Sequence, residues 1–157
     1  MHCESLGDDL GLYLRPMDKF GQLSMEALRS CRLVVDTGLH AMGWTFDQAV
    51  NYMLKNTAMT WQDVQDEVIR YATWPGQATA YKVGERVIRN LRDLAEEELG
   101  EAFDPRDFYD VVLNCGLVPL DMLEKFVKEY IEENKATMSM AKRTQDFGEW
   151  QQDIAKD

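Results

Sequence analysis

Apolar residues in this chain recur at intervals of three and four, and helix start and stop signals separate the segments that carry them. This spacing gathers side chains on one face of an α-helix, whereas a half-buried strand would alternate at every second residue. The last such segment carries its apolar residues at Leu120, Leu123, Val127, Tyr130 and Ile131. No segment alternates as a strand would. The sequence therefore predicts an all-α fold, a multi-helix orthogonal array of about six to seven helices.

Capping residues and helix breakers set the expected helix bounds. Thr45 stands three residues before Gln48, and Thr60 stands three residues before Asp63, so each pair can close an N-terminal capping box. A glycine after the long second helix can end it in the left-handed conformation. The expected helices span about residues 4–14, 23–42, 77–99, 105–113 and 119–135, with two short helices opened by the two threonines.

The length and composition are typical of one globular domain. The chain has 157 residues, of which 45% are hydrophobic, so it can bury a core without disulfides or a structural metal. We expect a single helical domain over residues 1–135, followed by a polar and mobile tail over residues 136–157.

The charge argues against two classes of partner. There are 17 Lys and Arg residues against 28 Asp and Glu residues, which gives a net charge of −11. Nucleic acids and anionic membrane surfaces carry the same sign, so we expect neither as a partner. The aliphatic runs are no longer than that of Leu33-Val34-Val35. A bilayer-spanning helix needs about 20 apolar residues, so none is expected.

The N-terminus and the cysteines bear on the cellular compartment. Met1-His2-Cys3-Glu4 is neither basic nor followed by an apolar signal core, so the chain as written is expected in the cytoplasm. Three widely spaced cysteines, Cys3, Cys31 and Cys115, suit reduced thiols rather than a disulfide framework. The only two histidines, His2 and His40, are far apart and no H-E-x-x-H motif occurs, so no metal site is expected within this chain.

The long second helix carries a polar ridge on an otherwise apolar surface. Arg32, Asp36 and His40 stand four residues apart and fall on one face. Asp36 could accept the imidazole N–H of His40 and orient the ring, while Arg32 could hold the same carboxylate. Burying three such groups is costly unless they are paired. The ridge is therefore either a structural salt-bridge row with a satisfied core histidine or part of a polar cleft.

A second candidate segment starts at a Trp-Pro-Gly turn. In the helix that follows, Gln77, Tyr81 and Gly84 share one face, whereas Lys82 points about 100° away. An amide beside a phenol can bind a carbonyl or carboxylate group, and a glycine lets a neighbour approach closely. The alternative is that Gln77 is a first-turn residue and Tyr81 a half-buried core aromatic.

Several motifs give the sequence a family resemblance. The chain resembles the C-terminal part of the family labelled domain of unknown function 885, helical proteins similar to zinc-dependent metallopeptidases of the gluzincin type. The resemblance covers about residues 4–131. The motifs that carry it are Glu4-Ser5-Leu6-Gly7, Gly11-Leu12-Tyr13, Asp18-Lys19-Phe20-Gly21, the run from Arg32 to His40, Gly43-Trp44-Thr45, and the run from Trp74 to Lys82.

The resemblance implies a large helical peptidase-like fold with a channel, in which an H-E-x-x-H helix and a later glutamate hold zinc. This sequence contains neither element, so we expect zinc and a peptide substrate only in a full-length parent, of which this chain is a C-terminal fragment. His40 and Tyr81 would line the channel opposite the zinc and stabilise an oxyanion. Gln77, Lys82 or Arg32 would hold the substrate carboxylate.

The sequence also allows two alternatives to an inactive peptidase fragment. The chain is alternatively a stand-alone helical interaction or oligomerisation module without catalysis. A helix buried on nearly all sides in so short a chain should leave an apolar face. Both interpretations therefore predict a homo-oligomer or a complementing N-terminal segment. The net charge of −11 also fits a small acidic protein that binds a basic peptide.

Overall fold

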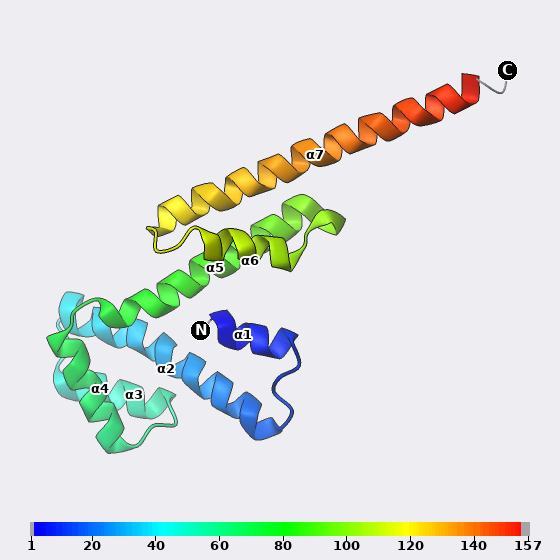
Figure 1. Ribbon diagram of the computed structural model, residues 1–157. Helices are drawn as coiled ribbons and strands as arrows, with labels where there is room; N and C mark the ends of the chain where they lie inside the picture. The colour runs from blue at the N-terminus through cyan, green and yellow to red at the C-terminus, as the bar shows by residue number, and fades with distance from the viewer. Residues whose placement is uncertain (1, 155–157) are drawn as a thin grey trace. The chain divides into compact units, whose positions relative to one another are not determined.

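A computed structural model describes residues 2–154 of the chain (Figure 1). Within this range it contains α-helices, one short 3-10 helix and no strand, which confirms the all-α, multi-helix fold predicted from the sequence. The elements are α1 (His2–Asp9), α2 (Pro16–Ala41), α3 (Phe46–Asn56), α4 (Trp61–Thr73), α5 (Gln77–Leu99), η1 (Gly100–Ala102), α6 (Pro105–Asn114) and α7 (Leu120–Ile154).

The chain divides into two compact units, residues 1–88 and residues 89–157. The boundary falls inside α5, so the first turns of this helix belong to one unit and its remaining turns to the other. No linker composition marks the boundary, because a continuous helix crosses it. Within residues 2–154, no helix is both long enough and apolar enough to span a bilayer.

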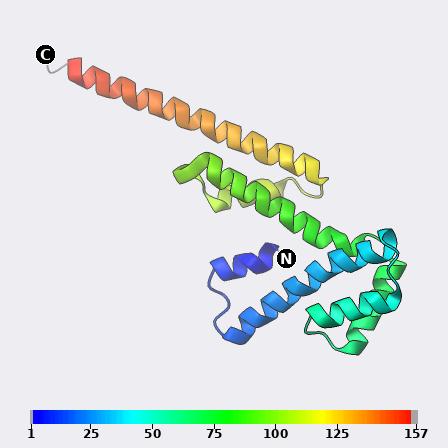
Figure 2. The same ribbon diagram turned by 180° about the vertical axis from the view of Figure 1, so that it is seen from behind.

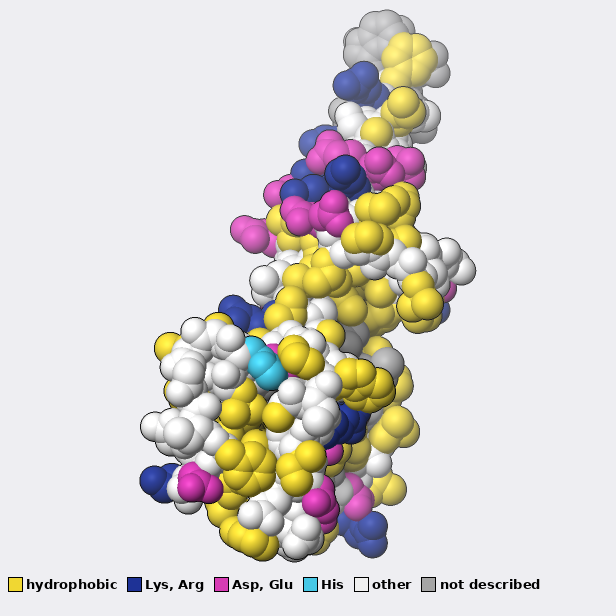
Figure 3. All heavy atoms as spheres, turned by 90° about the vertical axis from the view of Figure 1, so that its left-hand side faces the viewer, with side chains coloured by type: hydrophobic (Ala, Val, Ile, Leu, Met, Phe, Trp, Pro, Cys, Tyr) yellow, Lys and Arg dark blue, Asp and Glu magenta, His cyan; other side chains and the backbone are white. Residues whose placement is uncertain are grey.

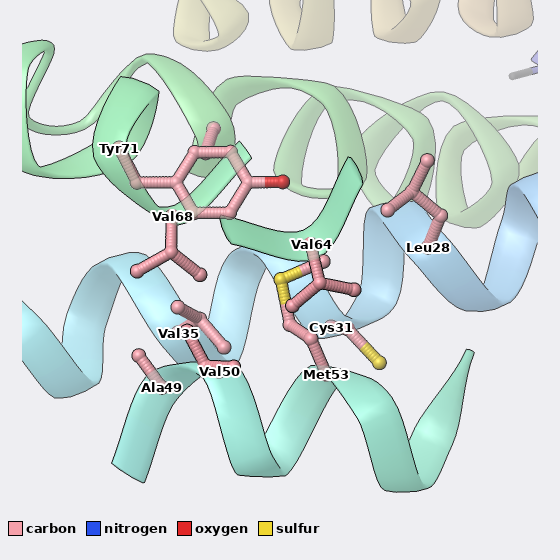
Figure 4. Packing of buried hydrophobic residues seen from close by; sticks show 10 residues of the cluster. Leu28, Cys31, Val35, Ala49, Val50, Met53, Val64, Val68 and Tyr71 are labelled. Carbon is pink, nitrogen blue, oxygen red and sulfur yellow. The ribbon is translucent and has the colours of Figure 1, made fainter. Parts of the chain in front are cut away.

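The core of the first unit is built by α2, α3 and α4. Apolar side chains at helical spacing on each of these helices turn toward a common interior (Figure 4). The labelled residues are Leu28, Cys31 and Val35 from α2, Ala49, Val50 and Met53 from α3, and Val64, Val68 and Tyr71 from α4. Burying a valine, leucine or methionine side chain contributes about 1.5–3 kcal/mol, so this cluster is the main stabilising contact among the three helices.

The predicted N-terminal caps are present. Thr45 Oγ1 accepts the backbone N–H of Gln48 at 3.2 Å, and the Gln48 side chain accepts the Thr45 N–H at 2.8 Å. Thr60 Oγ1 accepts the N–H of Asp63 at 3.3 Å, but the Asp63 carboxylate accepts the Thr60 hydroxyl at 2.6 Å instead of the Thr60 N–H, so the second capping box is only half formed. The bonds from backbone N–H groups satisfy donors that lack an intrahelical partner. The two short helices therefore begin where the sequence predicted.

The first two helices differ from their predicted bounds. α1 ends at Asp9 rather than near residue 14, and α2 begins at Pro16 rather than near residue 23. Proline is favoured at the first helical position because its fixed φ suits the helix and its missing N–H has no intrahelical acceptor there. The Asp18 carboxylate accepts the Arg15 N–H at 3.1 Å and completes the cap. Gly21, expected in a loop, lies inside this helix.

The second unit contains the rest of α5, η1, α6 and α7 (Figure 2). Within it, α6 contacts α7. Its buried residues are Leu91, Ala95, Leu99, Phe108, Leu123, Val127 and Ile131. The expectation that the last helix ends near Lys135 is wrong, because α7 continues to Ile154. Its residues 136–144 are exposed. The mobility predicted for residues 136–157 stays a prediction, and residues 155–157 lie outside the described range.

Candidate functional site

A partly buried polar triad links α2 to α4 in the first unit. Arg32 donates from Nε to Tyr71 Oη at 3.0 Å and from Nη2 to Glu67 Oε2 at 2.7 Å. Tyr71 closes the triad by donating to the same Glu67 oxygen at 2.6 Å. The predicted ridge residue Arg32 is therefore paired with α4, one helix away, and not with the neighbouring Asp36.

The charges of the triad also balance, because the Arg32 guanidinium faces the Glu67 carboxylate. Burial works against ionisation of Glu67, but the hydrogen bonds from Tyr71 and Arg32 outweigh it and lower the pKa of this carboxyl. Burial and the hydrogen bond to Glu67 raise the pKa of the Tyr71 phenol above its usual range. At neutral pH the triad consists of a guanidinium, a carboxylate and a neutral phenol.

Asp36 holds the turn between α4 and α5. Both of its carboxylate oxygens accept the backbone N–H of Gly76, at 3.1 and 3.0 Å. The residue is only 3% exposed. The expectation that Asp36 bridges Arg32 and His40 is wrong, because the carboxylate is turned toward the glycine. Its structural effect is to fix the start of α5, where Gln77 and Tyr81 stand.

His40, near the end of α2, is exposed and contacts α4. Its Nε2 lies 3.0 Å from the backbone oxygen of Tyr71. Because a carbonyl can only accept, Nε2 carries the hydrogen and Nδ1 remains an acceptor in the neutral ring. The orientation of this ring is thus set by a backbone carbonyl and not by the Asp36 carboxylate.

Gln77 and Tyr81 lie side by side, as their spacing predicted, and Arg70 joins them. Gln77 donates from Nε2 to Tyr81 Oη at 3.4 Å and accepts from Arg70 Nη2 at 3.4 Å. The guanidinium carbon of Arg32 lies 5.6 Å from the centroid of the Tyr81 ring. Tyr81 is 41% exposed. The structure therefore brings together Arg32, Gln77 and Tyr81 from the predicted set.

Lys82 belongs to a different group of contacts. Its Nζ lies 3.1 Å from Glu26 Oε1 on α2 and 2.9 Å from Glu85 Oε2 on α5. Glu85 is 4% exposed, so this cation is largely enclosed by carboxylates. Gly84 was expected to allow a close approach, but no atom lies within 4 Å of a Cβ built there. Neither residue extends the face formed by Gln77 and Tyr81.

The contribution of α4 was not predicted from the sequence. Glu67, Arg70 and Tyr71 stand at positions i, i+3 and i+4, which is the spacing of neighbours on one helix face. That spacing was the available signal, but nothing in it reveals that the partner is Arg32, 35 residues earlier. Among the described residues, no group of three or more His, Cys, Asp or Glu side chains could hold a metal ion.

Comparisons with known proteins give the chain a family and a close structural relative. The family model "Bacterial protein of unknown function (DUF885)" matches residues 1–127. A crystal structure described as "the putative lipoprotein from Colwellia psychrerythraea" is 42% identical, with a TM-score of 0.82 over 84% of this chain. This chain spans 23% of the length of that lipoprotein. No curated protein matches the chain.

Proposed function

The chain belongs to the DUF885 family, and from this premise we propose that it is the C-terminal channel-wall portion of a zinc-dependent peptidase or carboxypeptidase-like hydrolase. The proposal extends the resemblance of its motifs to gluzincin-type peptidases. The observation that supports it best is the pair formed by the half-buried Gln77 and the exposed Tyr81, with the Arg32 guanidinium against the Tyr81 ring. Such a pair can present an amide and a phenol to a peptide.

Each proposed contact has a distinct chemical task. The Tyr81 phenol donates a hydrogen bond to the oxyanion that forms when water adds to an amide carbonyl. His40 is a second contact of the channel wall, with its ring anchored on the Tyr71 carbonyl at 3.0 Å. Asp36 acts as an orienting residue, but through Gly76 and the start of α5 rather than through the imidazole. Gln77 positions the phenol.

The zinc implied by the resemblance does not fit the described residues. They contain no group of three or more suitable ligands, whereas a catalytic zinc takes three protein ligands and one open position. The proposed role of this chain is therefore to bind and orient the peptide. A zinc ion would be held by other segments of a full-length parent, and this chain by itself would not hydrolyse peptides.

A chimera tests the proposal directly. The matching segment of the Colwellia lipoprotein is replaced by this chain, and the chimera is assayed for bound zinc and for hydrolysis of unblocked peptides. Because the Tyr81 hydroxyl would stabilise the transition state, Tyr81→Phe should lower kcat by about 10–100-fold, a typical size for the loss of one such hydrogen bond. The isolated chain should show neither activity nor stoichiometric zinc.

Tyr52→Phe is the matched control, because it removes a phenol from the same unit at a ring that packs on Trp44. It should leave kcat unchanged. If the chimera and the natural lipoprotein both bind zinc and hydrolyse no peptide, or bind no zinc at all, the proposal is wrong.

The alternative, a non-catalytic interaction or oligomerisation module, has its own support in exposed apolar side chains (Figure 3). Leu12, Leu14 and Met17 are 65%, 86% and 70% exposed. Surface of this kind favours a covering partner, either a second copy or a complementing N-terminal segment. Light scattering of the purified chain tests whether these side chains are covered by a partner. A monomer at high concentration would count against a second copy and against a complementing segment alike.

The description of the relative as a lipoprotein supports an exported, lipid-anchored parent rather than the cytoplasmic location predicted from the chain as written. Fractionation of cells that make the full-length parent distinguishes the two. Recovery in the soluble cytosol would contradict the exported location.

A further inference from the structure

Two of the cations near the site are already neutralised by carboxylate partners. The Arg32 side chain is 12% exposed and lies 2.7 Å from the Glu67 carboxylate. The Lys82 side chain is 16% exposed and contacts the carboxylates of Glu26 and Glu85. A ligand that approached either cation would have to displace these carboxylates. Neither of the two predicted cations is therefore well placed to hold a substrate carboxylate.

Arg70 is different because its charge is only partly satisfied. Its side chain is 40% exposed, and Nη1 lies 3.6 Å from Glu67 Oε1, too far for a hydrogen bond. Its Nη2 donates to Gln77 at 3.4 Å, which is a long contact. Glu67 carries one negative charge and is held closely by Arg32, so the pair of arginines retains one excess positive charge. That excess lies in a chain whose net charge is −11.

The neighbours of Arg70 also offer hydrogen-bond donors to an anionic ligand. Tyr81 Oη accepts from Gln77 and keeps its own hydrogen for another acceptor. The planar guanidinium offers several N–H groups in a fork that matches the two oxygens of a carboxylate. A phenol and a guanidinium joined through one amide thus form a donor-rich patch on the exposed side of α4 and α5.

We propose that Arg70, held beside Gln77 and Tyr81, is the binding site for a carboxylate, with the free C-terminus of a peptide as its ligand, while the Tyr81 hydroxyl stays available for the oxyanion. This moves the carboxylate-binding role from Arg32 and Lys82 to a residue that the sequence did not single out. The choice of a peptide rests on the proposed function, but the binding step needs neither zinc nor hydrolysis. Arg32 acts as a positioning residue, because its guanidinium packs against the Tyr81 ring and binds the Glu67 carboxylate, which keeps that carboxylate from the ligand.

Binding is measured by NMR titration of the purified, isotope-labelled chain with acetyl-alanyl-alanine, with its C-terminal amide, and with acetate. The free acid should shift the backbone resonances of residues 76–81 in a saturable way. The amide should bind at least about tenfold more weakly, since it loses a charged hydrogen bond. Binding of the dipeptide acid without acetate assigns the site to peptide C-termini. Binding of the dipeptide acid and of acetate assigns the site to carboxylates in general. If neither the dipeptide acid nor acetate binds, the proposal is overturned.

Variants separate this site from general effects of charge. Arg70→Gln should weaken binding of the free acid about tenfold or more and abolish the difference from the amide. Arg70→Lys should give an intermediate loss, because it keeps the charge without the fork. Arg106→Gln is the control, since that side chain is 89% exposed in the second unit and should change nothing. Circular dichroism checks that each variant is folded.

The result is independent of the chimera assay. Carboxylate binding that requires Arg70, together with an inactive chimera, would leave this site in place and overturn the proposed hydrolase. An active chimera, together with equal affinity of the chain for the acid and the amide, would support the proposed hydrolase and overturn this binding site. Unchanged affinity in Arg70→Gln would also overturn the site.

Discussion

The backbone N–H of Gly76 donates to both carboxylate oxygens of Asp36, at 3.1 and 3.0 Å. A buried residue of α2 thereby fixes the turn before α5. The start of α5 carries Gln77 and Tyr81, so their position relative to α4 depends on the hydrogen bonds that Asp36 makes to the turn before them. The proposed site is held in place by this contact as well as by the Arg32 triad.

Asp36→Asn should therefore destabilise the chain and loosen the turn. The amide keeps one acceptor oxygen but loses the charge that strengthens the bond to Gly76. We expect the free energy of unfolding to fall by about 1–3 kcal/mol, measured by urea denaturation. The exposed Asp47→Asn is the control, with an expected change within about 0.5 kcal/mol. Equal values for the two variants would contradict the role given to Asp36.

Gly38 and Gly84 should respond in opposite ways to a methyl group. A Cβ at Gly38 would lie 2.5 Å from Cδ2 of the Trp44 ring, so Gly38→Ala should cost about 1–3 kcal/mol through overpacking. Gly84 lies inside α5 with no atom within 4 Å of a built Cβ. Gly84→Ala should therefore stabilise by about 0.5–1 kcal/mol. Thermal unfolding of the pair measures both, and the same sign for both would be inconsistent with this packing.

The Glu67 carboxyl makes stability depend on acid pH. Its pKa is lowered in the folded state from an ordinary value of 4.5, so its contribution is present above pH 4.5 and is lost as the pH falls below it. Glu67→Gln should destabilise by about 1–3 kcal/mol at pH 7 because Arg32 loses its carboxylate partner. The gap to the natural chain should narrow below pH 4.5.

Urea denaturation at a series of pH values from 7 to about 3 follows this gap. The exposed Glu101→Gln is the control for loss of one negative charge and should stay within about 0.5 kcal/mol of the natural chain at pH 7. A gap that stays constant across the whole range would show that folding does not lower the pKa of Glu67.

Removal of residues 136–157 should leave the remaining chain stable. Residues 136–144 of α7 are exposed, whereas the buried α7 positions Leu123, Val127 and Ile131 all precede the cut. A chain of residues 1–135 should keep its free energy of unfolding within about 0.5 kcal/mol, while its helical signal falls. A loss of more than about 1 kcal/mol in denaturant unfolding would mean that the removed turns contribute to the core.

Local chemistry explains which parts of the fold could be predicted. The caps at Thr45 and Thr60 and the side-by-side placement of Gln77 and Tyr81 depend on residues within four positions of one another, and all were predicted. The start of α2 was misplaced because a proline can either follow the end of one helix or occupy the first turn of the next, and periodicity alone does not distinguish the two roles of Pro16. The end of α7 was misplaced because helix formers continue beyond the apolar face.

The sequence by itself determined the helices, their caps and the polar residues that each helix carries, because these follow from contacts within a turn or two of the backbone. Only the tertiary structure decided the partners. Arg32, Asp36 and His40 share one ridge, yet each pairs with a different atom on a segment more than 30 residues away. A buried polar group pairs with the complementary group that helix packing brings nearest, and spacing along one helix does not contain that information.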